Sequence, residues 1–154
     1  MPEQTTLKRA RRDKRQGKSP STQAGEFVRE EMHHIREGKH GARSTKQAIA
    51  IGLSKARRAG VHLGKPPAGS KRSTKRSAQS ASRAGRRRSK SSRPSSTRSR
   101  AATRALRREG RRAASPKALA RQAKSAARRR PKSARRASAR RAAHTRQRRR
   151  RASA

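Results

Sequence analysis

Nearly all large apolar residues of this chain lie in its first 63 positions, where they follow a helical rhythm. Four apolar residues recur at steps of four, four and three, namely Ala24, Val28, Met32 and Ile35. Residues at these steps share one face of a helix. Ser21 or Thr22 is available as an N-cap, and Gly38 stands where the glycine that follows a helix is expected. The pattern therefore predicts a helix over residues 23–37.

A second apolar pattern predicts another helix, which begins after Ser44 and ends before Gly60. Ser44 followed three residues later by Gln47 fits a capping box. The apolar face of this helix consists of Ile49, Leu53 and Ala56. Gly52 lies beside that face, where the lack of a side chain would let the first helix approach closely.

The two predicted helices form an αα-hairpin whose apolar faces meet. Its predicted core consists of Phe27, Val28, Met32, Ile35, Ile49 and Leu53. Ile51 points about 160° away from the apolar face, so it is either a scattered exposed residue or part of a second interface. With so few large side chains, an isolated hairpin is marginal. Homo-oligomerisation through the hairpin, or docking on nucleic acid, would stabilise it.

The chain changes character near residue 64. Residues 64–154 hold 34 of the 49 Lys and Arg residues and a single acid, Glu109, which gives a formal charge of +33. Low hydropathy with such a charge is typical of disorder. Ser115 and Pro116 can start a helix that runs to Arg130 once phosphates screen the repulsion between its cations.

These patterns predict a mostly α-helical protein with extensive disorder, in which an αα-hairpin precedes a disordered or conditionally helical basic tail. We divide the chain into a basic N-terminal arm (1–20), a helical hairpin module (21–63) and an Arg/Ala/Ser/Lys-rich tail (64–154). With 27% apolar residues, the chain cannot build a core along its full length. We expect no membrane-spanning segment and no secretory signal, because no apolar run is long enough for either.

The net charge of +42 indicates a polyanionic partner, and nucleic acid is the default choice. Lys and Arg displace counterions from phosphates, so the tail could cover at most about 33 phosphates, or about 16 base pairs. Tyr and Trp are absent, which leaves no stacking platform for bases. We therefore expect sequence-tolerant contacts to the phosphate backbone, with duplex DNA favoured over RNA. The candidate contacts are Arg11, Arg12, Arg86, Arg87, Arg88, Arg107, Arg108, Arg128, Arg129, Arg130, Arg148, Arg149, Arg150 and Arg151.

Histidines near the end of the first helix raise the question of a metal site. Glu30 with His34, and His33 with Glu37, are four residues apart, so each pair could chelate from one helix face, with His40 nearby. No HExxH motif, diagnostic third ligand or cysteine accompanies them, so the sequence predicts exposed polar residues and no metal. It also lacks a nucleophile elbow, a glycine-rich phosphate loop and a paired acid and base, so we expect neither an enzyme nor a cofactor.

Two segments, FVREEMHHIREGKHG (27–41) and KQAIAIGLSKARRAG (46–60), resemble a small bacterial family of unknown function. Its members pair an "MHxFKxG"-like helix end with a "KQAIAIALSEARKAG"-like helix; here Gly52 and Lys55 replace the usual Ala and Glu. This resemblance implies a bacterial origin and a module boundary, and it implies no activity. The tail is similar in composition to the C-terminal tails of linker histones and bacterial histone-like proteins, including the SPK triplet at 115–117.

Together these features predict a sequence-tolerant DNA-binding protein of the bacterial cytoplasm, nucleoid-associated or histone-like, that acts through phosphate contacts. Two alternatives remain open. One is an RNA-binding or ribosome-associated factor, and the other is a protein-interaction module with a polybasic tail. A membrane partner is not expected, because the tail has no apolar face of Leu, Phe or Trp.

Overall fold

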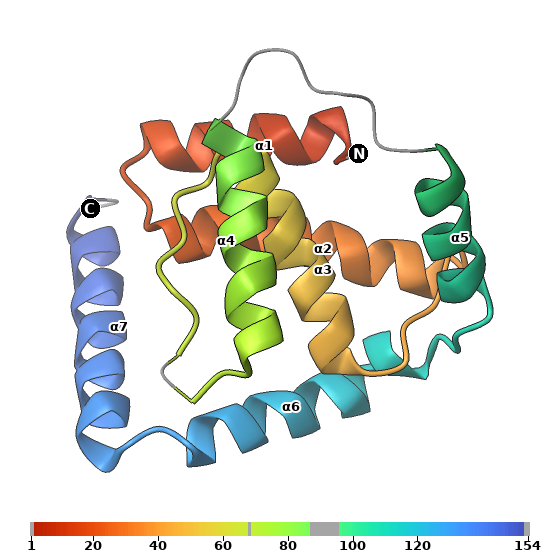
Figure 1. The fold of residues 1–154 in the computed structure, drawn as a ribbon. Helices are drawn as coiled ribbons and strands as arrows, with labels where there is room; N and C mark the ends of the chain where they lie inside the picture. The colour runs from red at the N-terminus through yellow and green to blue at the C-terminus, as the bar shows by residue number, and fades with distance from the viewer. Residues whose placement is uncertain (1, 68, 87–95, 153–154) are drawn as a thin grey trace. The chain divides into compact units, whose positions relative to one another are not determined.

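The computed structural model describes residues 2–67, 69–86 and 96–152, and the chain is mostly helical there, with no strand in these ranges (Figure 1). The helices are α1 (Gln4–Arg15), α2 (Pro20–Arg36), α3 (Thr45–Arg58), α4 (Arg72–Arg86), α5 (Ser96–Arg107), the short 3₁₀ helix η1 (Arg112–Ala114), α6 (Pro116–Arg128) and α7 (Lys132–Ala152). The chain forms two compact units, Met1–Ala118 and Leu119–Ala154. Within the described residues, no helix is long and apolar enough to cross a bilayer.

The first predicted helix is present as α2, and it begins three residues earlier than expected. Ser19, rather than Ser21 or Thr22, is the N-cap, and its hydroxyl accepts a hydrogen bond from the Thr22 backbone N–H at 3.3 Å. Pro20 fits the first helical position because its fixed φ is already helical. Gly38 ends the helix with φ +78°, as predicted.

The second predicted helix is α3, and its end signals act as expected. The Ser44 hydroxyl accepts from the Gln47 N–H at 3.2 Å, while Gln47 Oε1 accepts from the Arg43 N–H at 2.8 Å. In the usual capping box, the side chain at the third helical position accepts from the N–H of the N-cap residue. Here Gln47 accepts from the N–H of Arg43, one residue before the N-cap Ser44. Gly60 follows the helix with φ +88°.

Helices α2 and α3 pack closely at Gly52, as the sequence predicts. A Cβ atom at this position would lie 2.8 Å from Val28 Cα, a distance that real Cβ atoms do not reach. The inward face of α3 consists of Ala48, Gly52 and Ala56. Ala56 lies on this face as predicted, whereas Ala48 and Gly52 replace the predicted Ile49 and Leu53, because small residues bring the two backbones together.

The burial of the predicted core residues follows from this rotation. Phe27, Met32 and Ile35 of α2 are buried. Val28 of α2 and Ile49 and Leu53 of α3 are half-buried, because they flank the contact instead of filling it. The hairpin core is therefore built mainly from α2 side chains and from small residues of α3.

The segment predicted as a basic N-terminal arm forms α1, which packs against α2. Ala10 and Thr6 are buried there, and Leu7 packs against the core. Asp13 is also buried and forms an ion pair with Lys18 at 2.7 Å. Periodicity did not reveal this helix, because its buried face is short and partly polar.

Packing also continues beyond residue 63, which the sequence did not predict. Ala81 of α4 is buried, and a Cβ atom at Gly85 would overlap the Arg57 carbonyl oxygen of α3. In η1, the buried carbonyl of Ala113 accepts from the Thr45 hydroxyl at 2.7 Å. Alanine and glycine make these contacts, so a search for large apolar residues misses them. Helices α4–α7 occupy much of the segment for which the sequence predicted disorder.

Candidate nucleic-acid interface

Helix α4 presents a one-sided row of cations. Arg72, Lys75, Arg76, Arg83 and Arg86 share one face at 100° per residue, and each is exposed. The opposite face consists of small residues that turn toward α3, namely Ala78, Ala81, Ser82 and Gly85. Packing on α3 therefore fixes which way this basic face points.

Helix α6, which begins in the last residues of the first unit and continues into the second, repeats this arrangement. Lys117, Arg121, Lys124 and Arg128 follow at steps of four, three and four, so they lie on one face, and all four are exposed. Helix α6 contains no acidic residue and no buried residue. Ser115 caps its N-terminus by accepting from the Ala118 N–H at 3.2 Å, as predicted. The helix is thus a rod with a continuous cationic side.

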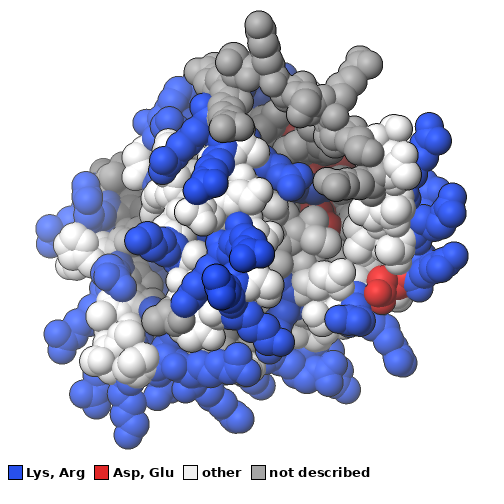
Figure 2. All heavy atoms as spheres, in the orientation of Figure 1, with Lys and Arg blue, Asp and Glu red and all other residues white. Residues whose placement is uncertain are grey.

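The predicted contact arginines are exposed wherever the structure describes their side chains. These are Arg11, Arg12, Arg86, Arg107, Arg108, Arg128, Arg129, Arg130, Arg148, Arg150 and Arg151. Arg87, Arg88 and the side chain of Arg149 lie outside the described part of the chain. Figure 2 shows Lys and Arg side chains projecting over much of the visible face, where few acidic side chains are seen.

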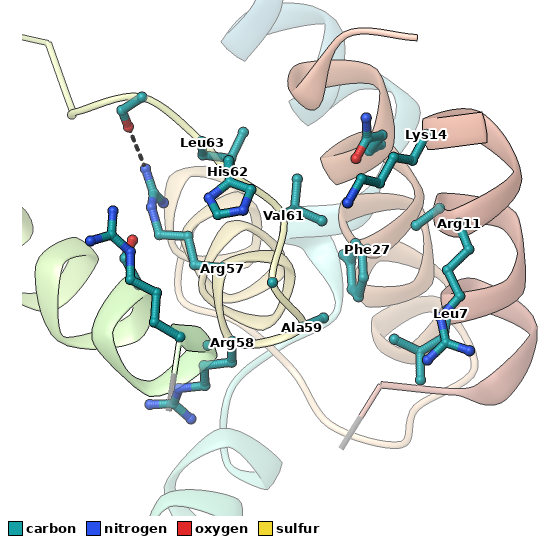
Figure 3. A pocket seen from close by; sticks show the side chains of 17 residues that line it. Leu7, Arg11, Lys14, Phe27, Arg57, Arg58, Ala59, Val61, His62 and Leu63 are labelled. Atoms are coloured by element: carbon teal, nitrogen blue, oxygen red, sulfur yellow. Dashed lines mark hydrogen bonds between the residues drawn. The ribbon is translucent and has the colours of Figure 1, made fainter. Parts of the chain in front are cut away.

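The first unit also contains a cationic hollow of about 700 Å³ between α1, the end of α3, residues 61–64 and α4 (Figure 3). Its cations are Arg11, Lys14, Arg57, Arg58 and Arg86, and its lining includes no acid. Its apolar lining comes from Leu7, Phe27, Val61 and Leu63. One guanidinium is held in place, since Arg57 Nη2 donates to the Gly64 carbonyl at 3.1 Å.

The hollow brings together cations that are far apart in the sequence. Of the predicted contacts, Arg11 and Arg86 line it. Sequence reasoning missed Lys14, Arg57 and Arg58, because the three come from two helices whose packing was not foreseen. The concentration of positive charge suits a phosphate group, for which Arg supplies directional donors.

Four acidic residues of the first unit, Glu3, Glu30, Glu31 and Glu37, form a separate cluster with a few basic partners. Glu31 is fully buried, with Lys55 Nζ at 2.7 Å from Oε2 and His40 Nε2 at 3.3 Å from Oε1. Lys55 also lies 3.3 Å from Glu30, whose other oxygen accepts from the Glu3 backbone N–H at 3.2 Å. These bonds tie the start of α1 and the last turn of α3 to α2.

Three exposed members of this cluster, Glu3, Glu37 and Lys39, have pKa values shifted from those of the free side chains. The pKa of Glu3 is lowered, mainly by its hydrogen bond to His34 and then by Lys39. The pKa of Glu37 is lowered by Lys39 and then by His33. The pKa of Lys39 is raised, mainly by Glu37. Each shift favours the charged form, so the ion pairs stabilise the folded state at neutral pH.

One part of the chain matches a known protein family. Residues 15–67 match the sequence profile of a family of unknown function, DUF6496. The match covers α2 and α3 and about a third of the chain. No curated protein and no solved structure matches the chain significantly. The comparisons therefore attach no activity to the module or to the tail.

Proposed function

We propose that this protein binds duplex nucleic acid, DNA ahead of RNA, through the phosphate backbone and without sequence preference. The observation that carries the proposal is the acid-free cationic surface of the second unit. Residues 119–154 contain fifteen Lys and Arg residues and no Asp or Glu. The unit offers this excess of cations no Asp or Glu side chain, so an external polyanion such as nucleic-acid phosphates is the expected counterpart.

In this proposal, helices α6 and α7 form only when phosphates neutralise their cations. Cations four residues apart on α6 repel one another, because no acid is interleaved with them. Helix α6 also buries no side chain that could offset the repulsion. We infer that free tails are largely unfolded at low salt and that α6 and α7 form as phosphates screen their charge.

The first unit adds a smaller phosphate-binding surface in the same proposal. The exposed row on α4 and the cationic hollow both present Arg86. A backbone phosphate seated in the hollow would orient the first unit on the duplex while the tail supplies most of the affinity. Such a protein would act in the bacterial cytoplasm as a nucleoid-associated, histone-like factor.

The test is a salt titration of affinity for duplex DNA with two full-length tail variants. One variant replaces the fifteen tail cations of residues 119–154 with Gln, and its matched control replaces the thirteen arginines among them with Lys. We expect the Gln variant to lower the slope of log affinity against log salt by up to about 13 units. The Lys control should keep most of the slope, because it keeps the charge.

Two outcomes would overturn the proposal. If the Gln variant keeps the slope of the unmodified chain, the second unit is not the binding surface. If affinity differs strongly between duplexes of unrelated sequence at equal salt, the contacts read bases. A preference for structured RNA over duplex DNA at equal phosphate concentration would instead select an RNA-associated role. Retention of a protein partner by the Gln variant would favour an interaction module.

A further inference from the structure

Three side chains that suit a metal ion converge where the end of α2 meets the loop before α3. They are Glu31, His34 and His40, and their ligand atoms all lie within 4.8 Å of one another. Glu31 is fully buried, and the side chains of His34 and His40 are 13% and 15% exposed. The sequence had paired Glu30 with His34, whereas the loop brings His40 to Glu31 instead.

The carboxylate of Glu31 is poorly satisfied by its protein neighbours. Neither of its oxygens makes a hydrogen bond, although both are buried. Lys55 approaches Oε2 at 2.7 Å, so the ammonium group supplies charge without hydrogen-bond alignment. Oε1 lies 3.3 Å from Nε2 of His40. A buried carboxylate oxygen is costly unless a cation or a donor compensates it.

The ring of His40 is held in the orientation of a metal ligand. Its Nδ1 lies 3.1 Å from the Gly41 carbonyl oxygen, which can only accept, so Nδ1 carries the hydrogen. In the neutral ring, Nε2 then directs a lone pair at Glu31 Oε1, and two acceptors face each other at 3.3 Å. A backbone carbonyl that holds the far nitrogen of a histidine is a common support for a metal-bound ring.

The spacing of these two atoms fits one metal ion. Zinc lies about 2.0–2.1 Å from histidine nitrogens and carboxylate oxygens, so two tetrahedral ligands are roughly 3.3–3.4 Å apart. Glu31 Oε1 and His40 Nε2 are 3.3 Å apart. His34 is supported in turn by Glu3, whose Oε1 lies 2.8 Å from His34 Nε2.

The charge of the surrounding cluster favours a divalent cation. Four carboxylates, those of Glu3, Glu30, Glu31 and Glu37, are linked by ion pairs to only two ammonium groups, those of Lys39 and Lys55. With neutral imidazoles this leaves a formal charge of −2 within a chain of net charge +42. One divalent ion cancels this local excess; the alternative is protonation of two imidazoles.

We propose that Glu31, His34 and His40 bind a divalent transition-metal ion, with Zn²⁺ the best match to two imidazoles and one carboxylate. Lys55 holds the second oxygen of Glu31, so the carboxylate binds through Oε1. The ion would fasten the loop to the end of α2 and so stabilise the first unit. This inference is independent of nucleic-acid binding.

The test is competition between the full-length protein and a chromophoric zinc chelator at neutral pH. We expect binding of one Zn²⁺ per chain, and an increase in Tm on adding Zn²⁺ but not Mg²⁺. His34→Gln and His40→Gln should each weaken zinc binding at least tenfold, on the order of what loss of a supporting or coordinating group costs. His33→Gln is the matched control, since His33 lies on the same helix but is exposed and pairs with Glu37.

Three results would overturn the site. The first is that the unmodified chain fails to compete for Zn²⁺. The second is that His33→Gln weakens zinc binding as much as His40→Gln does. The third is that zinc binding survives in the His34→Gln/His40→Gln double variant. Glutamine keeps a polar group at both positions, and circular dichroism of each variant establishes that α2 and α3 remain folded. Absence of competition would mean that protons, rather than a metal ion, balance the cluster.

Discussion

Helices α1–α3 and helices α6–α7 are held in different ways. In the first group, Phe27 and Ile35 are fully buried, and Glu31 joins α2 to Lys55 of α3. In α6, no residue is buried and no acid is present. The first group is thus stabilised by its own packing and ion pairs. Helix α6 has high helix propensity from Ala and Arg but has neither a buried residue nor an acid to stabilise it.

The contrast shows how the chain divides its charge between folding and binding. Residues 1–63 contain six of the seven acids; each forms an ion pair, and the pairs of Glu3, Glu30 and Glu31 link helices. Residues 64–154 contain only Glu109. Cations near the acids contribute to the fold, whereas in our proposal the cations of the tail bind an external polyanion.

The largest expected effect is a change in the helical content of residues 119–154. We expect the full chain at low salt to show the far-ultraviolet circular dichroism of the first unit alone. Inorganic polyphosphate, which is transparent in this region, should then increase the helical signal as α6 and α7 form, because it screens their repulsion.

The full-length variant with Gln in place of the fifteen tail cations is the control for this experiment. Its helical signal should respond much less to polyphosphate, since residues 119–154 of this variant carry no cation to neutralise. An unmodified chain that is already fully helical at low salt, with no increase on adding polyphosphate, would contradict conditional folding of the tail.

A smaller effect concerns the packing of the first unit. Gly52→Leu should destabilise the α2–α3 contact by about 2–3 kcal/mol or more, because even its Cβ would meet the backbone at Val28. The matched control is Gly25→Ala in α2, where a Cβ meets nothing within 4 Å. That change should stabilise the unit by about 0.5–1 kcal/mol.

Thermal unfolding followed by circular dichroism measures both changes, and DNA affinity is measured beside it. If the two regions are separate in function, Gly52→Leu lowers Tm while the salt slope of DNA binding stays close to that of the unmodified chain. Equal stability of Gly52→Leu and the unmodified chain would show that α2 and α3 do not pack through this glycine.

Whether a helix could be predicted from the sequence depends on the kind of residue that makes its contacts. Large apolar residues and end signals predicted α2 and α3, including the roles of Ser44, Gly38 and Gly60. Helix α4 was missed because its buried face is made of Ala81 and other small residues, which carry little hydrophobic signal. Small residues also rotated the inward face of α3 away from Ile49 and Leu53.

The candidate sites were predictable only where one segment supplies the residues. The pairing of His33 with Glu37 follows from helical spacing and is present at 3.2 Å. The approach of His40 to Glu31 depends on the path of a loop, which spacing does not determine. The cationic hollow likewise draws on five segments, so its residues could not be grouped before their packing was known.

The smallest expected effect is the pH dependence of the exposed ion pairs in the first unit. The lowered pKa of Glu37 means that its carboxylate stabilises the folded state above the ordinary glutamate range and loses this contribution as pH falls through its folded-state pKa. The raised pKa of Lys39 keeps its contribution intact until pH rises above the lysine range. Glu37→Gln should therefore lower Tm slightly at pH 7 and have almost no effect at a pH below the folded-state pKa of Glu37, where the carboxylate is protonated in both states.

The measurement is Tm of the unmodified chain and of Glu37→Gln at both pH values, repeated at high salt. Salt should shrink the difference at pH 7, because both partners are exposed and screened. If the difference in Tm between the two proteins is the same at low pH, the hydrogen bonds of Glu37, and not its charge, stabilise the fold. The acidic cluster would then resemble the packed contacts of the first unit more closely than the charged surface of the tail.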